Sequence, residues 1–377
     1  MNLKQKDSNG EATLLARLIY QIFDLAREER TFIIIVGVMV LFVGAVYPYP
    51  QIAMWTGFTL AAYSAIANDS IQTIGTFIAS NKKKKWYFLW LFMGIIFVAT
   101  VSYSWVTYNG DVTYQRLAVK GFSEAPTEFN FLQLAAPIVL LILTRARMPV
   151  STTFLLLSSF STENEAIVSV ITKSLGGYFM AFFAAMIIWF SIAKLAKDFF
   201  KGKPSPVWLP IQWITSGALW SFWIMQDAAN VAIYLPRQLD TIQFVIFAGS
   251  IFAGMGLLFY LKGDKIQSIV DEKAGVSDIR AATLVDFVYA ALIYYLKIQS
   301  NIPISTTWVF IGLLGGRELA IALSKTRRKN RLRKSKKANR MIFKDALKAF
   351  IGLVVSLLLA FMANENMREQ ILSYVGI

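Results

Sequence analysis

The feature that most constrains this chain is a set of apolar runs that each approach or exceed the ~18 apolar residues needed to cross a bilayer. The clearest runs cover residues 32–50, 86–108, 177–193, 244–261 and 341–362. Backbone groups surrounded by lipid must be satisfied within their own segment, so such runs form helices. A content of 56% hydrophobic and only 16% charged residues argues against a soluble domain. We therefore predict an all-α, multi-pass protein of the cell membrane.

The N-terminal region is expected to hold a leading span and a helix before it. The first apolar run begins near residue 32, and no small-residue cleavage site follows it, so we expect it to remain as a span. One helical face before this run carries Leu14, Leu15, Leu18, Ile19, Ile22 and Phe23. Residues 1–48 are thus predicted to form an amphipathic helix in the membrane interface and a leading span, a helix packed on the bundle being the alternative.

Two residue types are missing, which removes several kinds of chemistry. The chain contains no Cys and no His, so disulfides, thiolate metal sites and histidine proton relays are excluded. The formal net charge is +15, and ten Lys or Arg residues lie in one predicted loop, residues 325–340. Beside apolar runs, such a loop indicates a determinant of topology or a contact with anionic lipid rather than nucleic-acid binding.

Two polar motifs each occur twice. The first is an acid between two carboxamides, Asn68-Asp69-x-x-Gln72 and Gln226-Asp227-x-x-Asn230. The second is Pro-x-Ser-Thr-Thr, with hydroxyls from Ser151, Thr152 and Thr153 in one copy and Ser305, Thr306 and Thr307 in the other. Because the motifs follow in the same order at similar separations, we predict an internal duplication. Its parts are repeats at 49–196 and 208–363, a linker at 197–207 and a C-terminal tail at 364–377.

The charges of the loops indicate that the two halves have opposite orientations. In five pairs of equivalent loops, the excess of Lys and Arg falls alternately on the first and the second half. Under the positive-inside rule, equivalent loops then face opposite sides, and the repeat is inverted. We predict about eleven transmembrane segments, with broken helices or re-entrant segments at the motifs. The N-terminus and residues 82–85 and 325–340 are expected in the cytoplasm, and residues 109–130 outside.

The acid-containing motifs have the chemistry of a cation site. A carboxylate at membrane depth is costly unless it faces a cavity or binds a cation. Carboxylate and amide oxygens suit a hard cation such as Na⁺. We predict that Asn68, Asp69, Gln226 and Asp227 bind Na⁺, with H⁺ as the alternative coupling ion. The competing interpretation is that the amides bond across helices and that the acids are buried in protonated form.

The hydroxyl motifs have the chemistry of an anion site. Proline starts a helix readily, so each Ser-Thr-Thr is expected in a first turn, where free N–H groups and the positive end of the dipole collect. Two such helix starts from opposite halves are predicted to enclose an oxyanion together with Gln72 and Asn230. The alternative is that the hydroxyls only cap or join helices. Cations at the aspartates remove the repulsion of a divalent anion, which is a physical basis for symport.

The doubled motifs resemble those of the inorganic phosphate transporter family, whose members co-transport phosphate with Na⁺ or H⁺. Departures from the family pattern lie at Ile66, Gln72, Gln226, Phe154 and Trp308, the last two where the family has His. The resemblance covers about residues 49–363. It implies a secondary active transporter that imports an inorganic oxyanion, most directly phosphate, by alternating access, with no cofactor beyond the coupling ion. The oligomeric state stays open, a homodimer included.

Three other functions compete with this interpretation. A sulfate permease of the same fold binds an anion of similar shape, and a membrane sensor or scaffold could keep the fold without transport. An intramembrane aspartyl protease also uses two acids on neighbouring spans. The chain lacks the Gly-x-Gly-Asp signature expected of such a protease, so we predict that it is not an enzyme.

Overall fold

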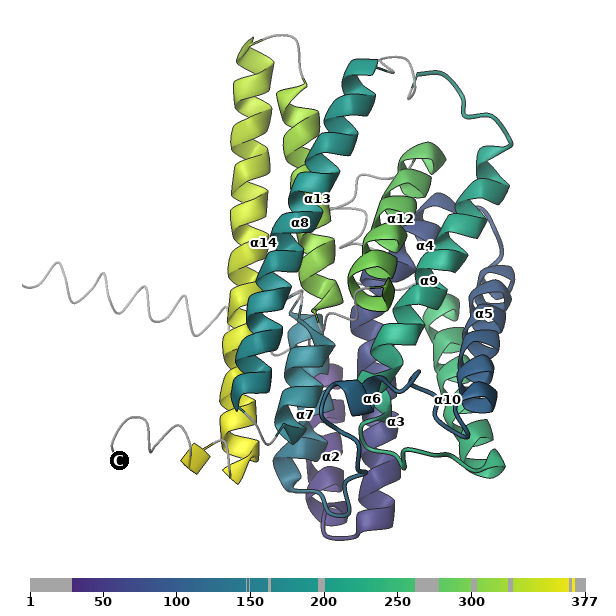
Figure 1. Cartoon of the computed structure of the whole chain (residues 1–377), viewed down its shortest axis with the longest axis vertical. Coiled ribbons are helices and arrows are strands. Elements are labelled where there is room, and N and C mark those ends of the chain that lie inside the picture. Colours follow the sequence, from purple (N-terminus) through teal and green to yellow (C-terminus); the bar gives the residue numbers. More distant parts are fainter. Residues whose placement is uncertain are drawn as a thin grey trace, which may run out of the picture. The chain divides into compact units, whose positions relative to one another are not determined.

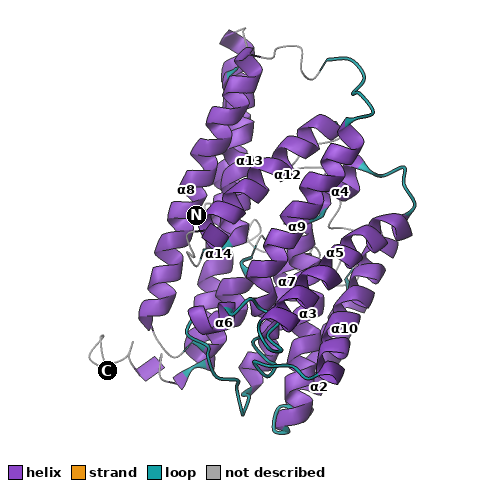
Figure 2. Cartoon of the chain, turned by 45° about the vertical axis from the view of Figure 1, so that its right-hand side comes forward, coloured by secondary structure: helices purple, strands orange, loops and turns teal. Residues whose placement is uncertain are grey.

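The computed structural model describes residues 29–146, 148, 150–161, 164–195, 201–261, 278–299, 304–324, 328–365 and 368–369, and all regular elements among them are helical (Figures 1 and 2). The chain divides into two compact units, Met1–Val46 and Tyr47–Ile377. The predicted amphipathic helix at residues 14–23 lies outside the described residues.

The first unit contains α2, Arg30–Val46, an apolar helix of 17 residues. It is shorter than the predicted run of residues 32–50. Pro48 disfavours a helical conformation in the residue before it, which ends the helix early. Pro50 then stands at the first position of the next helix, where its missing N–H costs nothing.

The second unit begins with eight helical elements. They are α3 (Pro50–Thr73), α4 (Gly75–Ser80), α5 (Trp86–Thr107), α6 (Arg116–Val119), α7 (Phe131–Arg145), the π-helix η1 (Thr153–Leu157), the 3₁₀ turn η2 (Ser158–Phe160) and α8 (Asn164–Leu195). The helices after the linker are α9 (Trp208–Ala232), α10 (Thr241–Tyr260), α12 (Ile279–Ile293), the π-helix η3 (Tyr294–Gln299), α13 (Thr306–Leu323) and α14 (Arg328–Ala363).

Six helices in the described part of the chain are long and apolar enough to cross a membrane. They cover Trp86–Thr107, Val168–Ile192, Thr241–Tyr260, Ile279–Leu296, Thr306–Leu323 and Lys329–Ala363. Large apolar side chains such as Ile95, Ile187 and Ile242 are exposed on these helices, as expected where lipid replaces water. The chain is therefore a multi-pass membrane protein. The count of about eleven spans remains a prediction.

Helices from the two halves of the sequence pair with one another. Within the halves, α3 packs on α7 and α9 packs on α12. Between them, α5 packs on α10 and α9, α10 packs on α3, α8 packs on α13, and α14 packs on η1 and η2.

A close approach of two backbones joins α13 to α8. A Cβ atom added to Gly312 would lie 2.2 Å from the carbonyl oxygen of Tyr178, and one added to Gly316 would lie 2.0 Å from that of Phe182. The two glycines are four residues apart, the spacing that lets membrane helices approach backbone to backbone. Only glycine fits at either position.

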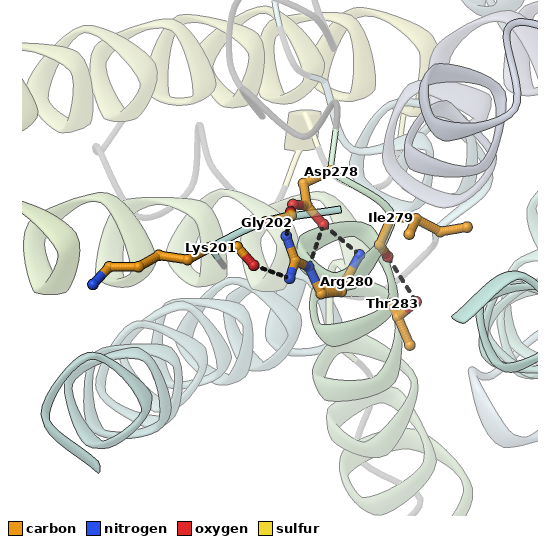
Figure 3. Close-up of polar contacts among 6 residues, drawn as sticks. All are labelled: Lys201, Gly202, Asp278, Ile279, Arg280 and Thr283. Carbon is orange, nitrogen blue, oxygen red and sulfur yellow. Dashed lines mark hydrogen bonds and ion pairs between the residues drawn. The ribbon is translucent and has the colours of Figure 1, made fainter. Parts of the chain in front are cut away.

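Arg280 ties the linker to the start of α12 (Figure 3). Its guanidinium donates hydrogen bonds to the carbonyl oxygens of Lys201 and Gly202, at 3.2 Å each. The same group forms an ion pair of 2.6 Å with Asp278, whose side chain also accepts from the backbone N–H of Arg280 and so caps α12. The start of α12 is thus fixed to the segment that enters α9.

Residues 325–340 were predicted to form a basic loop. For the residues described there this prediction is wrong, because α14 is helical from Arg328 onward. Lys and Arg are good helix formers, and most side chains of residues 329–340 are exposed, so their charges stay in water. A helix of 36 residues is about 54 Å long, well beyond the ~30 Å of a bilayer's hydrocarbon core. The basic part therefore projects from the membrane as a helix.

Candidate functional site

The two Ser-Thr-Thr segments have the same local structure at their serines. The backbone N–H of Phe154 donates to Ser151 Oγ at 3.3 Å, and that of Trp308 donates to Ser305 Oγ at 3.4 Å. Both serines thus cap the helical turn that follows, as the capping alternative predicts. The prolines of both motifs, residues 149 and 303, lie outside the described residues. The threonines after each serine are buried, so their hydroxyls have to bond inside the protein.

The second acid motif meets the first hydroxyl motif. Asn230 on α9 donates through Nδ2 to Thr152 Oγ1 at 2.9 Å and to Thr153 Oγ1 at 3.2 Å. The same nitrogen lies 3.1 Å from Asp227 Oδ1, one turn earlier on α9. One carboxamide therefore connects the Asp227 carboxylate to two hydroxyls from the other half of the chain.

The first acid motif meets both hydroxyl motifs at one backbone carbonyl. Asn68 on α3 donates through Nδ2 to Val150 O at 2.8 Å and to Asp69 Oδ1 at 2.9 Å. Thr307 on α13 also donates to Val150 O, at 3.2 Å. The Val150 carbonyl, one residue before Ser151, thus joins the first acid motif to the second hydroxyl motif.

The remaining predicted residues lie in or beside this cluster. Gln226 is buried next to Asp227 on α9, and Thr306 is buried in the first turn of α13. The backbone of Gln72 belongs to the last turns of α3, but its side chain lies outside what the structure describes. The acid residues Asp69 and Asp227 are both buried, at 1% exposure each.

Tyr289 on α12 is a member of the site that the motifs did not indicate. It is fully buried, and its hydroxyl donates to the backbone oxygen of Thr306 at 3.0 Å. Tyr289 therefore supports the start of α13, which carries the second hydroxyl motif.

Arg116 and Lys120 bring positive charge to the second acid motif. Lys120 Nζ donates to Asn230 Oδ1 at 3.2 Å. The Arg116 side chain is buried on α6; burial lowers the pKa of its guanidinium, and the nearby Asp227 carboxylate acts in the opposite direction. Both residues come from residues 109–130, which were predicted only as an external loop. Their spacing of four residues places them on one face of a helical turn, which was the signal available in the sequence.

This cluster offers oxygen atoms that can bind a hard monovalent cation and hydrogen-bond donors that can bind an anion. In the described part of the chain, no group of three or more Asp, Glu, His or Cys side chains could hold a metal ion. Carboxylate, amide and carbonyl oxygens remain, and these fit Na⁺ better than a transition metal. The hydroxyls and Lys120 can donate to an oxyanion. Asn230 Oδ1 already accepts a hydrogen bond from Lys120. A cation bound at Asp227 would therefore compete with the positive charge of this lysine.

Buried polar motifs held by interrupted and short helices, inside an all-helical multi-pass protein, are an arrangement that occurs in membrane transporters. The chain is similar in structure to a solved protein described as "The sodium-dependent phosphate transporter", with a TM-score of 0.51 and 16% sequence identity. The similarity covers 83% of this chain and 98% of that chain, so it extends over the whole fold of the transporter. No protein-family model matches the chain, and no curated protein matches its sequence.

Proposed function

We propose that this protein is a secondary active transporter that imports an inorganic oxyanion, phosphate in the first place, coupled to Na⁺. H⁺ is the alternative coupling ion. The cation sites are Asp69 with Asn68 and Asp227 with Gln226. The anion site consists of both Ser-Thr-Thr segments with Gln72 and Asn230.

The observation that carries this proposal is the convergence of the four motifs. They are separated by up to about 240 residues, yet Asn230 and the Val150 carbonyl connect all four through hydrogen bonds of 3.2 Å or less. A cluster that only held helices together would not need two carboxylates, each of which is costly in a membrane interior. A cation beside each acid and an anion at the hydroxyls remove that cost.

Inverted repeats are part of the proposal, and the helix pairings support them. Under the duplication, α3 corresponds to α9, α5 to α10 and α7 to α12. The contact of α3 with α7 is then repeated by that of α9 with α12, and the contact of α5 with α9 by that of α10 with α3. The start of α14 and the connection from α4 to α5 lie toward one end of the second unit in Figures 1 and 2, and α6 lies toward the other. The strongly basic segments thus share an end, which we assign to the cytoplasm.

The order of binding follows from the charges. Two carboxylates repel a phosphate, so cations have to bind first. Arg116 and Lys120 already supply positive charge beside Asp227 and Asn230. We infer that the anion binds after Na⁺ occupies the acid sites.

Reconstituted protein in liposomes tests the proposal. Radiolabelled phosphate and sulfate are supplied outside, with and without an inward Na⁺ gradient and with an inward H⁺ gradient as a third arm. We expect Na⁺-driven phosphate uptake above that of empty liposomes. Preferential sulfate uptake would reassign the substrate. Absence of uptake for both anions under all gradients would favour the sensor or scaffold.

A further inference from the structure

A second buried polar cluster lies outside the four motifs, around Asp286 on α12. Asp286 is fully buried within an apolar span. Thr76 on α4 donates to its Oδ1 at 2.5 Å, and Ser216 on α9 donates to its Oδ2 through a short hydrogen bond. Among the described residues no cation forms an ion pair with Asp286. A lone carboxylate at this depth is costly, so it marks a functional group by default.

The hydrogen bonds around Asp286 have a fixed direction. The indole N–H of Trp213 can only donate, and it donates to Asn81 Oδ1 at 3.1 Å. Asn81 Nδ2 then donates to Gln212 Oε1 at 2.9 Å, and Gln212 Nε2 donates to Ser216 Oγ at 3.0 Å. Ser216 Oγ accepts this hydrogen bond through a lone pair, and its own hydrogen is then donated to Asp286 Oδ2. Each link fixes the next, so Oδ2 of Asp286 always receives a hydrogen bond.

We propose that Asp286 is a proton-binding site of this protein, and that the proton binds at Oδ1, the oxygen that faces Thr76. The Oδ1–H bond forms as one O–H bond of a hydronium ion breaks, and a neutral water molecule is left. The hydroxyl of Thr76 then changes from donor to acceptor, while the bond from Ser216 stays as it is. Protonation therefore acts on the contact between α12 and α4, and leaves the contact between α12 and α9 unchanged.

The geometry favours a proton over a metal ion at this site. The hydroxyl oxygens of Thr76 and Ser216 already touch the carboxylate oxygens, at 2.5 Å for Thr76. A hard cation stands at about 2.3–2.6 Å from each of six or more oxygens, which separates those oxygens from one another. No other acid joins Asp286 in a ligand group within the described chain. The direct hydroxyl contacts leave a proton as the ligand that fits.

The groups that face Asp286 are neutral. They are Thr76 from α4, and Ser216 from α9 with Gln212 behind it. On α12 itself, the titratable neighbour one turn further is Tyr289, whose hydroxyl donates to Thr306 O. No described residue of α8, α13 or η3, which also pack on α12, forms an ion pair with Asp286. Its charge is thus set by the proton and by these hydroxyls.

The cluster is connected to the candidate site through all three helices. Ser216 lies eleven residues, or about three turns, before Asp227 on α9, so both lie on one face of that helix. Asp286 lies one turn before Tyr289 on α12. Thr76 follows Asp69 across the break between α3 and α4 at Ile74. In addition, α7, the predicted counterpart of α12, contains no acid, so the duplicated motifs did not reveal this group.

Infrared difference spectroscopy on the purified full-length chain tests the proposal without any transport measurement. Between about pH 5 and 8 we expect a band of a protonated carboxyl to appear as pH falls; the chain has no His to titrate in that range. The variant Asp286→Asn should lose the band. The control Asp278→Asn, which removes the partly exposed acid before the same helix, should keep it.

A second variant covers the case in which Asp286→Asn does not fold. Thr76→Val removes one donor to the ionised form, so the band should appear at higher pH than in the unchanged protein. The band should not respond to Na⁺ at constant pH. Absence of the band in the unchanged protein, its persistence in folded Asp286→Asn, or its loss on adding Na⁺ would each overturn the proposal. None of these outcomes depends on whether phosphate is transported.

Discussion

At the scale of single residues, Asn230 determines how the candidate site is assembled. Its nitrogen donates to Thr152, Thr153 and Asp227, and its oxygen accepts from Lys120. An aspartate at this position would keep the shape and lose every donor. The NH₂ group has two hydrogens for these three acceptors, and the amide oxygen can in turn accept from Thr153 Oγ1 at 3.4 Å, so one amide can serve an acid and two hydroxyls.

The threonine hydroxyls are predicted to bind the anion. Thr152→Val and Thr306→Val keep the shape and remove one hydroxyl each. A lost hydrogen bond to a charged ligand costs roughly 1.5–3 kcal/mol, so phosphate affinity should fall about ten- to a hundred-fold. Concentration dependence of uptake measures this. Thr172→Val is a matched control, because that hydroxyl donates only to its own helix at Val168 O. Unchanged affinity in both site variants would support the capping interpretation.

The two acids are predicted to bind the coupling cations with unequal importance. Asp69→Asn and Asp227→Asn each remove one charge at nearly constant volume. Gradient-driven uptake should lose its Na⁺ dependence or stop in each variant. The extent of the loss should differ between them, because Gln and Asn are swapped around the two acids. Uptake against a series of Na⁺ concentrations measures both. Intact Na⁺ dependence in both variants would show that the ion binds elsewhere.

At the scale of elements, the contact between α8 and α13 depends on two glycines. Gly312→Ala inserts a methyl group where a Cβ would lie 2.2 Å from Tyr178 O, so the helices must separate. Overpacking of this kind costs typically 1–3 kcal/mol, and the thermal unfolding midpoint in detergent should fall. Gly176→Ala on α8 is the control, since nothing lies within 4 Å of its Cβ position. Equal midpoints for the two variants would contradict the close approach.

The ion pair at the start of α12 predicts a stability change with pH. The side-chain hydrogen bond from Arg280 holds the pKa of Asp278 below its usual range. Because the folded pKa is depressed, this stabilisation is present above the unfolded value of about 3.9 and is lost as pH falls through the folded pKa. Asp278→Asn should therefore unfold at a lower temperature than the unchanged protein at pH 7. The difference should shrink as pH falls below about 3.9 and through the folded pKa. A difference that stays constant over that fall would contradict the assignment.

At the scale of the whole molecule, the orientation in the membrane can be tested with introduced cysteines, since the chain has none. Ser123→Cys and Asn330→Cys lie at exposed positions of the segments assigned outside and inside. In intact cells an impermeant thiol reagent should label position 123 and leave position 330 unlabelled. Lysed cells supply the control, where both positions should react. The reverse pattern in intact cells would invert the topology.

Apolar periodicity and the doubled motifs predicted much of this molecule. Four of the five apolar runs contain helices of spanning length, and the two hydroxyl motifs begin helical turns as expected. Single residues without a repeated partner were not predicted. Asp286 and Thr76 are 210 residues apart, and Lys120 and Asn230 are 110 apart, so only the folded chain brings them together. The Val150 carbonyl carries no signal in a sequence, because every residue has one.

The length of α14 has a mechanical consequence. This single helix packs on η1, which carries Thr153, and continues to a basic end far from that contact. The twelve residues 329–340 extend about 18 Å along the axis. The helix also packs on α13, where Ile342 lies near Gly315, so a movement of η1 or α13 that tilts this long helix also displaces its charged tip. A fluorescent probe on that tip would then report each turnover of the binding site from outside the membrane.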